Sequence, residues 1–267
     1  VRAWRARHPA GAVVCYINTS AAVKAECDYC CTSSNGEIII RAIDPDKAIL
    51  FVPDYYLGSY LKAKTGRNIQ LWKGYCPAHI AITPEGVDRL REQHPEAEFL
   101  MHPECGCLTK QMDLADKILS TDGMIQYVRQ APASSFIVAT ENGILYRMRR
   151  ENPGKTFIPA SEQASCHHMQ RNTLDKVLRS LVTLKHRVTV EPELAQRALV
   201  PLERMMDITP PPAVPGEAGS AFGERPFGST AGGGVTEAAR KGLDPWEADP
   251  SRGLWGDPIL ETANDLS

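Results

Sequence analysis

Residues 101–107 read MHPECGC and bring together the side-chain types that most often bind metal ions. His102 and Glu104 offer an imidazole and a carboxylate, and Cys105 and Cys107 offer two thiols. Zinc and other transition metals take their protein ligands from these groups. The two cysteines lack a second pair at the spacing of a tetrahedral zinc site, so spacing alone makes this only a weak metal signal.

Two further cysteines stand in loops next to predicted elements. Cys76, in LWKGYCPAH, follows Gly74 on a loop that leaves a predicted strand. Cys166, in ASCHHMQRNT, precedes a predicted helix, whose N-terminal backbone favours a thiolate. An isolated cysteine is more often a small buried apolar residue, and adjacent cysteines such as Cys30 and Cys31 seldom bind one metal ion. By spacing alone, all of these signals are weak.

The elements that must position these side chains alternate along residues 1–208. Short β-rich apolar runs (AVVCYI, AILFVP, NIQLW, EFLM, FIVAT) are interleaved with helix-like stretches (SAAVKAE, GVDRLREQ, QMDLADK, NTLDKVLRSLVTLKH). This alternation predicts an α/β fold with layers of helices around a mainly parallel sheet. Thr83-Pro84 and Asn172 mark the starts of two predicted helices.

The chain also repeats itself. Residues 1–18 align without a gap over residues 87–104, and four positions are identical: Val1/Val87, Arg5/Arg91, His8/His94 and Pro9/Pro95. Two later segments align as well, DYCCTSSNG (28–36) with DKILSTDG (116–123) and ILFVPDYYLG (49–58) with FIVATENGIL (136–145). The repeat predicts two similar three-layer αβα domains of about 80 residues each.

The repeat makes the ends of equivalent strands correspond. Tyr16-Ile17-Asn18 aligns with His102-Pro103-Glu104, and the turn Thr32-Ser33 aligns with Ser120-Thr121. In open α/β sheets, ligands bind beyond the carboxyl ends of strands and at helix N-termini, and both copies place polar side chains there. The sequence therefore predicts a pseudo-symmetric pocket between the two domains.

The bulk composition excludes several classes of protein. An apolar content of 43% and a charged content of 23% are typical of a globular protein, and a net charge of −2 gives no reason to expect nucleic acid or an anionic membrane as a partner. No apolar run approaches the roughly 18 residues of a transmembrane helix. Without a signal peptide, the eight scattered cysteines predict a reducing, cytoplasmic setting, in which metal-binding, catalytic or buried thiols are expected rather than disulfides.

The composition changes near residue 209. Residues 209–267 are rich in Pro, Gly and acidic residues and have no sustained apolar period, which predicts a disordered tail. PWEADP and GLWGDPIL are candidate peptide motifs for a partner, but an uncommitted tail is the favoured interpretation.

Taken together, eight segments resemble the quinolinate synthase family, the A protein of bacterial NAD biosynthesis. They run in order along the chain: YINTSAAVKAECDYCCTSSN, FVPDYYLGSYLKAKTG, LWKGYCPAH, HPEC, LADKILST, IVATENGILYRM, CHHMQRNTL and RALVPLERMMDI. The resemblance implies three pseudo-equivalent αβα domains around a central cavity. Residues 1–80 are then expected to be the second domain, 81–165 the third, and 166–208 a cluster loop with C-terminal helices. The first domain is expected upstream of Val1.

The resemblance also implies a reaction and a cofactor. The family condenses iminoaspartate with dihydroxyacetone phosphate to give quinolinate. It holds a [4Fe–4S] cluster by three cysteines, which leaves one iron position open for Lewis-acid chemistry. Two of the ligand positions match Cys76 and Cys166, and the third is expected upstream of Val1. An enzyme of the transferase type with small-molecule substrates and a functional link to L-aspartate oxidase follows from the resemblance.

The resemblance assigns roles to the strand-end residues that the repeat already nominates. Glu104 is implied as an acid–base group, and His102 as a group that binds or polarises the substrate. Contacts to carboxylate or phosphate are implied for four further side chains, Tyr16, Asn18, Ser33 and Thr121. The chain departs from the family at Leu119, where glycine is usual, and at Tyr55-Tyr56, where a basic or amide residue is common. Without the first domain the chain is expected to be inactive alone.

Two other classes of function stay open. One is a non-catalytic zinc-binding or redox-thiol α/β protein built on Cys105 and Cys107, and the other is a degenerate paralogue that binds a partner through its tail. Packing or incidental thiols are the favoured interpretation of six cysteines: Cys15, Cys27, Cys30, Cys31, Cys105 and Cys107. Of these, Cys30 or Cys31, Cys105 and Cys107 could still line the cavity.

Overall fold

The structure, a computed structural model, describes residues 1–209, which divide between two compact units. One unit contains Val1–Gln170 together with the segment that begins at Pro192, and the other contains Arg171–Glu191. Apart from Thr209, the predicted tail lies outside the described residues. Within the described part, no helix is both long enough and apolar enough to cross a membrane.

The first sheet has four parallel strands in the order β2-β1-β3-β4. The strands are β1 (Ala12–Tyr16), β2 (Tyr29–Cys31), β3 (Ile49–Val52) and β4 (Ile69–Leu71). The helices around and after it are α1 (Arg2–Arg7), α2 (Ala21–Lys24), α3 (Gly36–Ala42), α4 (Tyr55–Thr65) and α5 (Pro77–Ile80). The central strands β1 and β3 are buried along almost their whole length, as strands covered on both faces must be.

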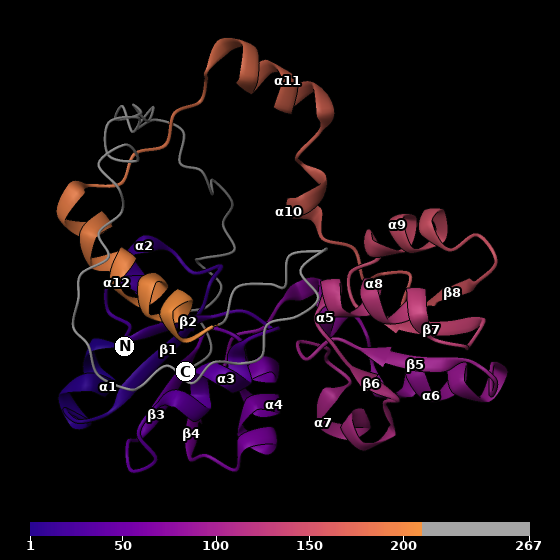
Figure 1. The fold of residues 1–267 in the computed structure, drawn as a ribbon, viewed down its shortest axis with the longest axis horizontal. Helices are drawn as coiled ribbons and strands as arrows, with labels where there is room; N and C mark the ends of the chain where they lie inside the picture. Colours follow the sequence, from indigo (N-terminus) through magenta and orange to yellow (C-terminus); the bar gives the residue numbers. More distant parts are fainter. Residues whose placement is uncertain (210–267) are drawn as a thin grey trace, which may run out of the picture. The chain divides into compact units, whose positions relative to one another are not determined.

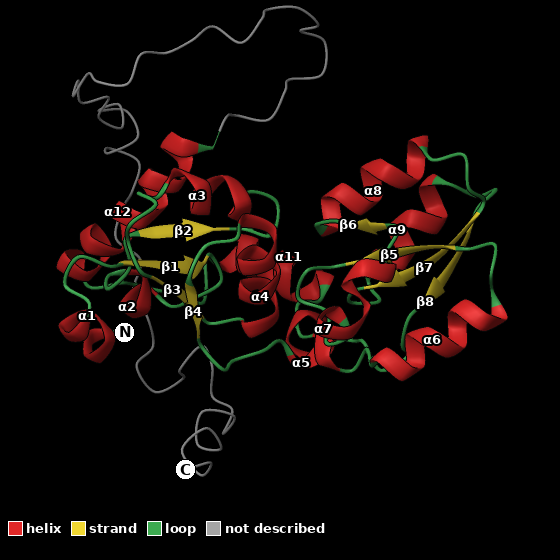
Figure 2. Ribbon diagram, turned by 90° about the horizontal axis from the view of Figure 1, so that it is seen from below, coloured by secondary structure: helices red, strands yellow, loops and turns green. Residues whose placement is uncertain are grey.

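The second sheet repeats this topology in the order β6-β5-β7-β8, again with all strands parallel. Its strands are β5 (Glu98–Met101), β6 (Lys117–Ile118), β7 (Ser135–Ala139) and β8 (Thr156–Pro159). The accompanying helices are α6 (Pro84–Gln93), α7 (Leu108–Gln111), the 3₁₀ turn Met112–Leu114, α8 (Thr121–Gln130) and α9 (Ile144–Glu151). Figures 1 and 2 show the two sheets, each flanked by helices above and below its strands.

The second sheet has a separate core on each face because its side chains alternate between the two. Phe99 and Met101 pack with Val87 of α6 and Leu108 of α7. Leu100, between them, packs on the other face with the buried residues of α8 and α9, including Met124, Val128 and Met148. Two apolar faces covered by helices make three layers, so the predicted α/β fold class with parallel sheets is confirmed. The domain boundaries at 80 and 165 stay predictions.

The two halves of the repeat share an equivalent hydrogen bond from a strand backbone to an aspartate. The carboxylate oxygen Oδ2 of Asp28 accepts the backbone N–H of Val13 at 2.7 Å, and Oδ2 of Asp116 accepts the N–H of Phe99 at the same distance. Val13 and Phe99 are the second residues of β1 and β5. In each half, an aspartate just before the edge strand therefore fixes the start of the central strand.

The last described helix, α12 (Pro192–Ile208), returns to the first sheet, where it contacts β2, α2 and α3. Met205 is buried in the core of that sheet. Polar contacts tie the same helix down: Arg197 lies 2.8 Å from Glu26, and the side-chain amide of Asn35 donates to Thr209 Oγ1 at 3.0 Å. The first core is thus completed from the far end of the described chain.

Local signals in the sequence explain most of the helix starts. Thr83 is the N-cap of α6 and accepts the N–H of Gly86 at 3.2 Å, as predicted. The start predicted at Asn172 lies slightly later, with Thr173 as the N-cap of α11 (Leu174–Thr183). Between these, the short helix α10 (His167–Gln170) follows Cys166 directly.

Candidate active site and metal centre

The candidate site forms where the carboxyl ends of the two sheets supply polar side chains. Tyr16 ends β1, and Glu104 follows β5 after a short turn. The Tyr16 hydroxyl hydrogen-bonds to the Glu104 side chain and to Ser33, and its pKa is raised chiefly by burial and further by the Glu104 carboxylate. The two strand ends that the repeat equates are therefore in direct contact.

Glu104 is the central carboxylate of the site. Its residue surface is only 4% exposed, and burial raises its pKa to about 7, with a smaller contribution from the negative charge of Asp54. The hydrogen bond from Tyr16 opposes that rise. One of its oxygens, Oε1, is buried without a hydrogen-bond partner in the protein. A carboxyl group that titrates near neutral pH can both accept and donate a proton during a reaction.

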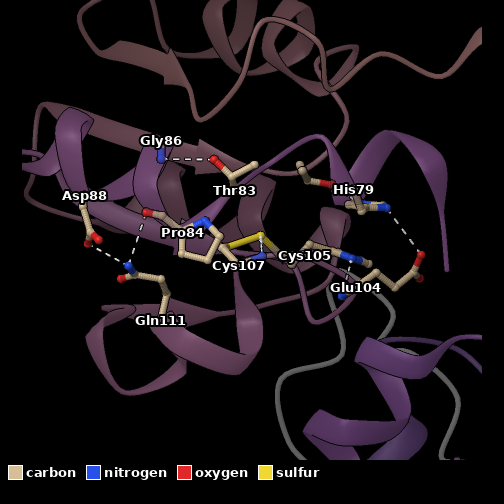
Figure 3. The surroundings of a disulfide bond; sticks show 11 residues. His79, Thr83, Pro84, Gly86, Asp88, Glu104, Cys105, Cys107 and Gln111 are labelled. Atoms are coloured by element: carbon tan, nitrogen blue, oxygen red, sulfur yellow. Dashed lines mark hydrogen bonds and ion pairs between the residues drawn. A yellow bond between two sulfur atoms is a disulfide. The ribbon is translucent and has the colours of Figure 1, made fainter. Parts of the chain in front are cut away.

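Two stacked histidines lie beside Glu104. The rings of His79 and His102 are 4.8 Å apart with an interplanar angle of 16°. Nδ1 of His79 lies 3.4 Å from Glu104 Oε2, a contact that Figure 3 marks, and Nε2 lies 3.0 Å from the Thr140 hydroxyl. Burial lowers the pKa of His79 to about 4 and that of His102 to about 3. Both rings are therefore neutral near pH 7, so the contact between His79 and Glu104 is not an ion pair.

The two cysteines expected to bind the cluster are free, half-buried thiols. Cys76 precedes α5, and Cys166 precedes α10 and donates its backbone N–H to Glu141 Oε1 at 3.0 Å. Burial raises the pKa of Cys76, backbone N–H groups of α5 counteract that effect, and the charges of Glu104 and Cys166 add to it. The charge of Cys166 is the smallest of the effects that raise the pKa of Cys76.

The other expected residues divide into two groups. Ser33 joins the site through Tyr16. Asn18 and Thr121 are exposed, and within the described residues no hydrogen bond of their side chains is recorded. Thr121 is the first residue of α8, whereas the neighbouring Ser120 is the N-cap and accepts the N–H of Gly123. The roles of Asn18 and Thr121 as ligand contacts stay predictions.

The sequence reasoning missed several residues of the site. Asp54 caps α4 through the N–H of Leu57 at 2.7 Å and affects the pKa of Glu104, while Thr140 and Glu141 follow β7 directly. The predicted strand FIVAT ends at Thr140 and Glu141 follows it, so the rule that placed Tyr16 and Glu104 at strand ends could have found both residues. His79 had a local signal too, because it stands three residues after Cys76.

The remaining cysteines do not join the site as a group. Cys15, Cys27, Cys30 and Cys31 are buried free thiols in the first core, as the packing interpretation expects, and Cys31 acts electrostatically on Tyr16. The expectation of free thiols throughout was wrong for one pair, because Cys105 and Cys107 form a disulfide, visible in Figure 3. The tight turn after Glu104 brings the two Cα atoms to 5.2 Å, within bonding reach of the two sulfurs.

Two parallel sheets, with a buried glutamate, two neutral histidines and two free thiols near their carboxyl ends, define an α/β protein with a candidate acid–base and metal-binding site. The chain belongs to the family described as quinolinate synthetase A protein, which matches residues 1–207. The resemblance predicted from the segments is confirmed.

Several relatives carry the name quinolinate synthase. That of Pyrobaculum aerophilum is 51% identical over 210 residues, which cover 76% of this chain and 68% of the relative. A quinolinate synthase of Thermus thermophilus is 46% identical, with 78% of this chain and 68% of the relative covered. That of Methanoregula boonei is 45% identical, with 76% and 66% covered.

Proposed function

We propose that the chain is an enzyme of NAD biosynthesis, a quinolinate synthase that condenses iminoaspartate with dihydroxyacetone phosphate. The family match and the names of the relatives support the activity. The observation that carries the proposal for this particular chain is the hydrogen-bonded pair of Tyr16 and the buried Glu104, whose charge acts on Cys76. Supply of iminoaspartate by an L-aspartate oxidase belongs to the same proposal.

The condensation requires enolisation, imine formation and dehydration, and each of these steps moves protons. Glu104 suits this role because its pKa of about 7 allows it to take up and release a proton near neutral pH. The Tyr16 hydroxyl is hydrogen-bonded to Glu104 and holds the carboxylate toward β1. His102, neutral because burial lowers its pKa, can offer one ring N–H to a substrate oxygen without adding charge.

We further propose that Cys76 and Cys166 hold two positions of a [4Fe–4S] cluster. Both are free and half-buried, neither is used in a disulfide, and each stands directly before a short helix, so the residues present fit such a group. When bound, the cluster would supply a Lewis acid for a substrate oxygen. The family resemblance implies a third cysteine from another domain. For that reason the experiment uses the protein at the full length that its gene encodes.

The test is anaerobic reconstitution with iron and sulfide, followed by an assay of quinolinate formation. Cys76→Ala and Cys166→Ala should each abolish the charge-transfer absorbance of the cluster, whereas Cys27→Ala, a buried thiol of the first core, should retain it. Glu104→Gln should keep the absorbance but lose turnover by about 10²–10⁴-fold, the usual contribution of a general acid or base. A wild-type protein that stays colourless and forms no quinolinate would contradict the proposal.

A further inference from the structure

Three side chains of the site, those of Cys76, His79 and Glu104, form a close group that does not include Cys166. The ligand-type atoms of Cys76, His79 and Glu104 all lie within 4.8 Å of one another. Cys76 is the N-cap of α5 and His79 is the third residue of that helix, while Glu104 lies just beyond the end of β5. Among the described residues, no other group of three or more His, Cys, Asp or Glu side chains is so close together.

Two buried polar atoms in this group have no hydrogen-bond partner in the protein. Nδ1 of His79 and Oε1 of Glu104 are both buried and unsatisfied, and their residues are 7% and 4% exposed. A buried polar atom without a hydrogen bond has lost its contacts with water and gained none in return, which destabilises the fold. Figure 3 shows that these two side chains face one another, so one cation placed between them would satisfy both.

The other ring nitrogen of His79 is already held in the manner of a metal ligand. Nε2 lies 3.0 Å from the buried Thr140 hydroxyl, and the ring stacks on His102. Histidines that bind metals usually engage their second nitrogen with a neighbouring polar group, which fixes the ring and the tautomer. Here that arrangement leaves Nδ1 directed toward Glu104.

We propose that Cys76, His79 and Glu104 bind a single Zn²⁺ ion, or a divalent metal of similar preference, whenever the cluster is absent. Thiolate, imidazole and carboxylate are the ligand types of zinc, and three protein ligands leave the fourth tetrahedral position for water. The charges of one thiolate and one carboxylate balance the dication. Tetrahedral bonds of about 2.0–2.3 Å place ligand atoms roughly 3.5 Å apart, so the three side chains need to move inward by only about 1 Å.

This site and the cluster exclude one another because both require Cys76. They differ in their remaining residues: the cluster uses Cys166, and the zinc site uses His79 and Glu104. The inference does not depend on the proposed reaction. It predicts that zinc occupies the protein in competition with iron–sulfur assembly.

The experiment titrates the whole chain, freed of metal by a chelator under anaerobic, reducing conditions, with zinc chloride and with cobalt(II) chloride. The wild type should take up one equivalent, and cobalt should give a thiolate charge-transfer band. Cys76→Ala and His79→Gln should lose the band, and Cys166→Ala should keep it. Thr140→Val should weaken binding by about 10–100-fold, as loss of a group that orients a ligand does, and Thr140→Ser should bind as the wild type does.

Glu104→Gln keeps the size of the side chain and removes a buried charge, so this variant guards against loss of binding through misfolding. It should unfold at or above the wild-type urea midpoint and yet lose the zinc equivalent. Wild-type protein that takes up no metal, or Cys76→Ala and His79→Gln variants that bind as the wild type does, would overturn the proposal. Cluster assembly without any zinc binding refutes this inference alone, while zinc binding without cluster assembly refutes only the proposed function.

Discussion

Asp28→Ala should destabilise the protein more than the equivalent substitution Asp116→Ala. Both aspartates accept a strand N–H at 2.7 Å, from Val13 and Phe99, and both of those residues are fully buried. Hydrogen bonds to a charged group contribute roughly 1.5–3 kcal/mol to stability. Asp116 is exposed and can exchange with water, so the lower half of that range, about 1.5–2 kcal/mol, is expected for Asp116→Ala.

Asp28 carries additional interactions that Asp116 lacks among the described residues. Its Oδ2 lies 2.7 Å from Arg5 Nη2, and its Oδ1 lies 3.8 Å from Arg204 Nη1 on α12. Partly exposed ion pairs contribute about 0.2–1 kcal/mol each. Asp28→Ala is therefore expected to cost about 2–4 kcal/mol, and Asp28→Asn, which keeps an acceptor for Val13, roughly half of that.

The assay is urea denaturation followed by far-UV circular dichroism, with each free energy of unfolding obtained from the midpoint and slope. The matched pair of alanine variants removes the same strand contact from each repeat, so their difference isolates the ion pairs of Asp28. An Asp28→Ala variant within about 0.5 kcal/mol of the wild type, or one no less stable than Asp116→Ala, would refute this account of the strand starts.

Two other expectations concern the first sheet. Gly58→Ala should destabilise the folded protein by about 1–3 kcal/mol, the usual cost of overpacking. The added Cβ would lie 2.6 Å from Leu71 Cδ2 and 2.8 Å from Phe51 Cδ1. A urea midpoint above that of the wild type would contradict the close approach of α4 to these side chains. Glu26 forms ion pairs with Arg2 and Arg197, and the hydrogen bond from Arg2 is the main cause that lowers its pKa. A carboxyl group whose pKa is lower in the folded state than in the unfolded state stabilises the fold fully when the pH is above its unfolded-state pKa. This stabilisation is lost as the pH falls through its folded-state pKa. Glu26→Gln should therefore cost about 0.5–1 kcal/mol at pH 7, and this cost should disappear as pH falls through the lowered pKa of Glu26, as measured by thermal unfolding across pH. A cost that persists in acid, where Glu26 is protonated, would show that the contribution is not electrostatic.

The fold class could be predicted from the sequence because its signals are local and because the internal repeat presents them twice. The alternation of strands and helices predicted the parallel sheets, and the alignment of 1–18 with 87–104 predicted that they would share a topology. The same alignment brought Tyr16 and Glu104 to equivalent strand ends, where the structure joins them by a hydrogen bond. Strand ends are predictable because parallel strands present their carboxyl ends at a single edge.

Two of the features that were missed depend on three-dimensional contacts that the sequence pattern did not report. The role of His79 follows from Thr140, which is 61 positions away, and no local pattern in YCPAH reports that contact. The disulfide between Cys105 and Cys107 depends on the tight turn after Glu104, and spacing alone did not predict it. Asn18 and Thr121 were chosen by strand-end position and by resemblance, and the described side chains around them do not test that choice.

The docking of α12 has a consequence for the order in which the chain can fold. The core between β5, β7, α8 and α9 draws only on residues 100–157, so it can close as soon as that stretch is complete. The first core instead needs Met205, and Asn35 meets its partner Thr209 across 174 positions. Contacts at such separations form late because a long loop must close before they are gained. During synthesis, the half that leaves the ribosome first is therefore expected to be the last to reach its final packing.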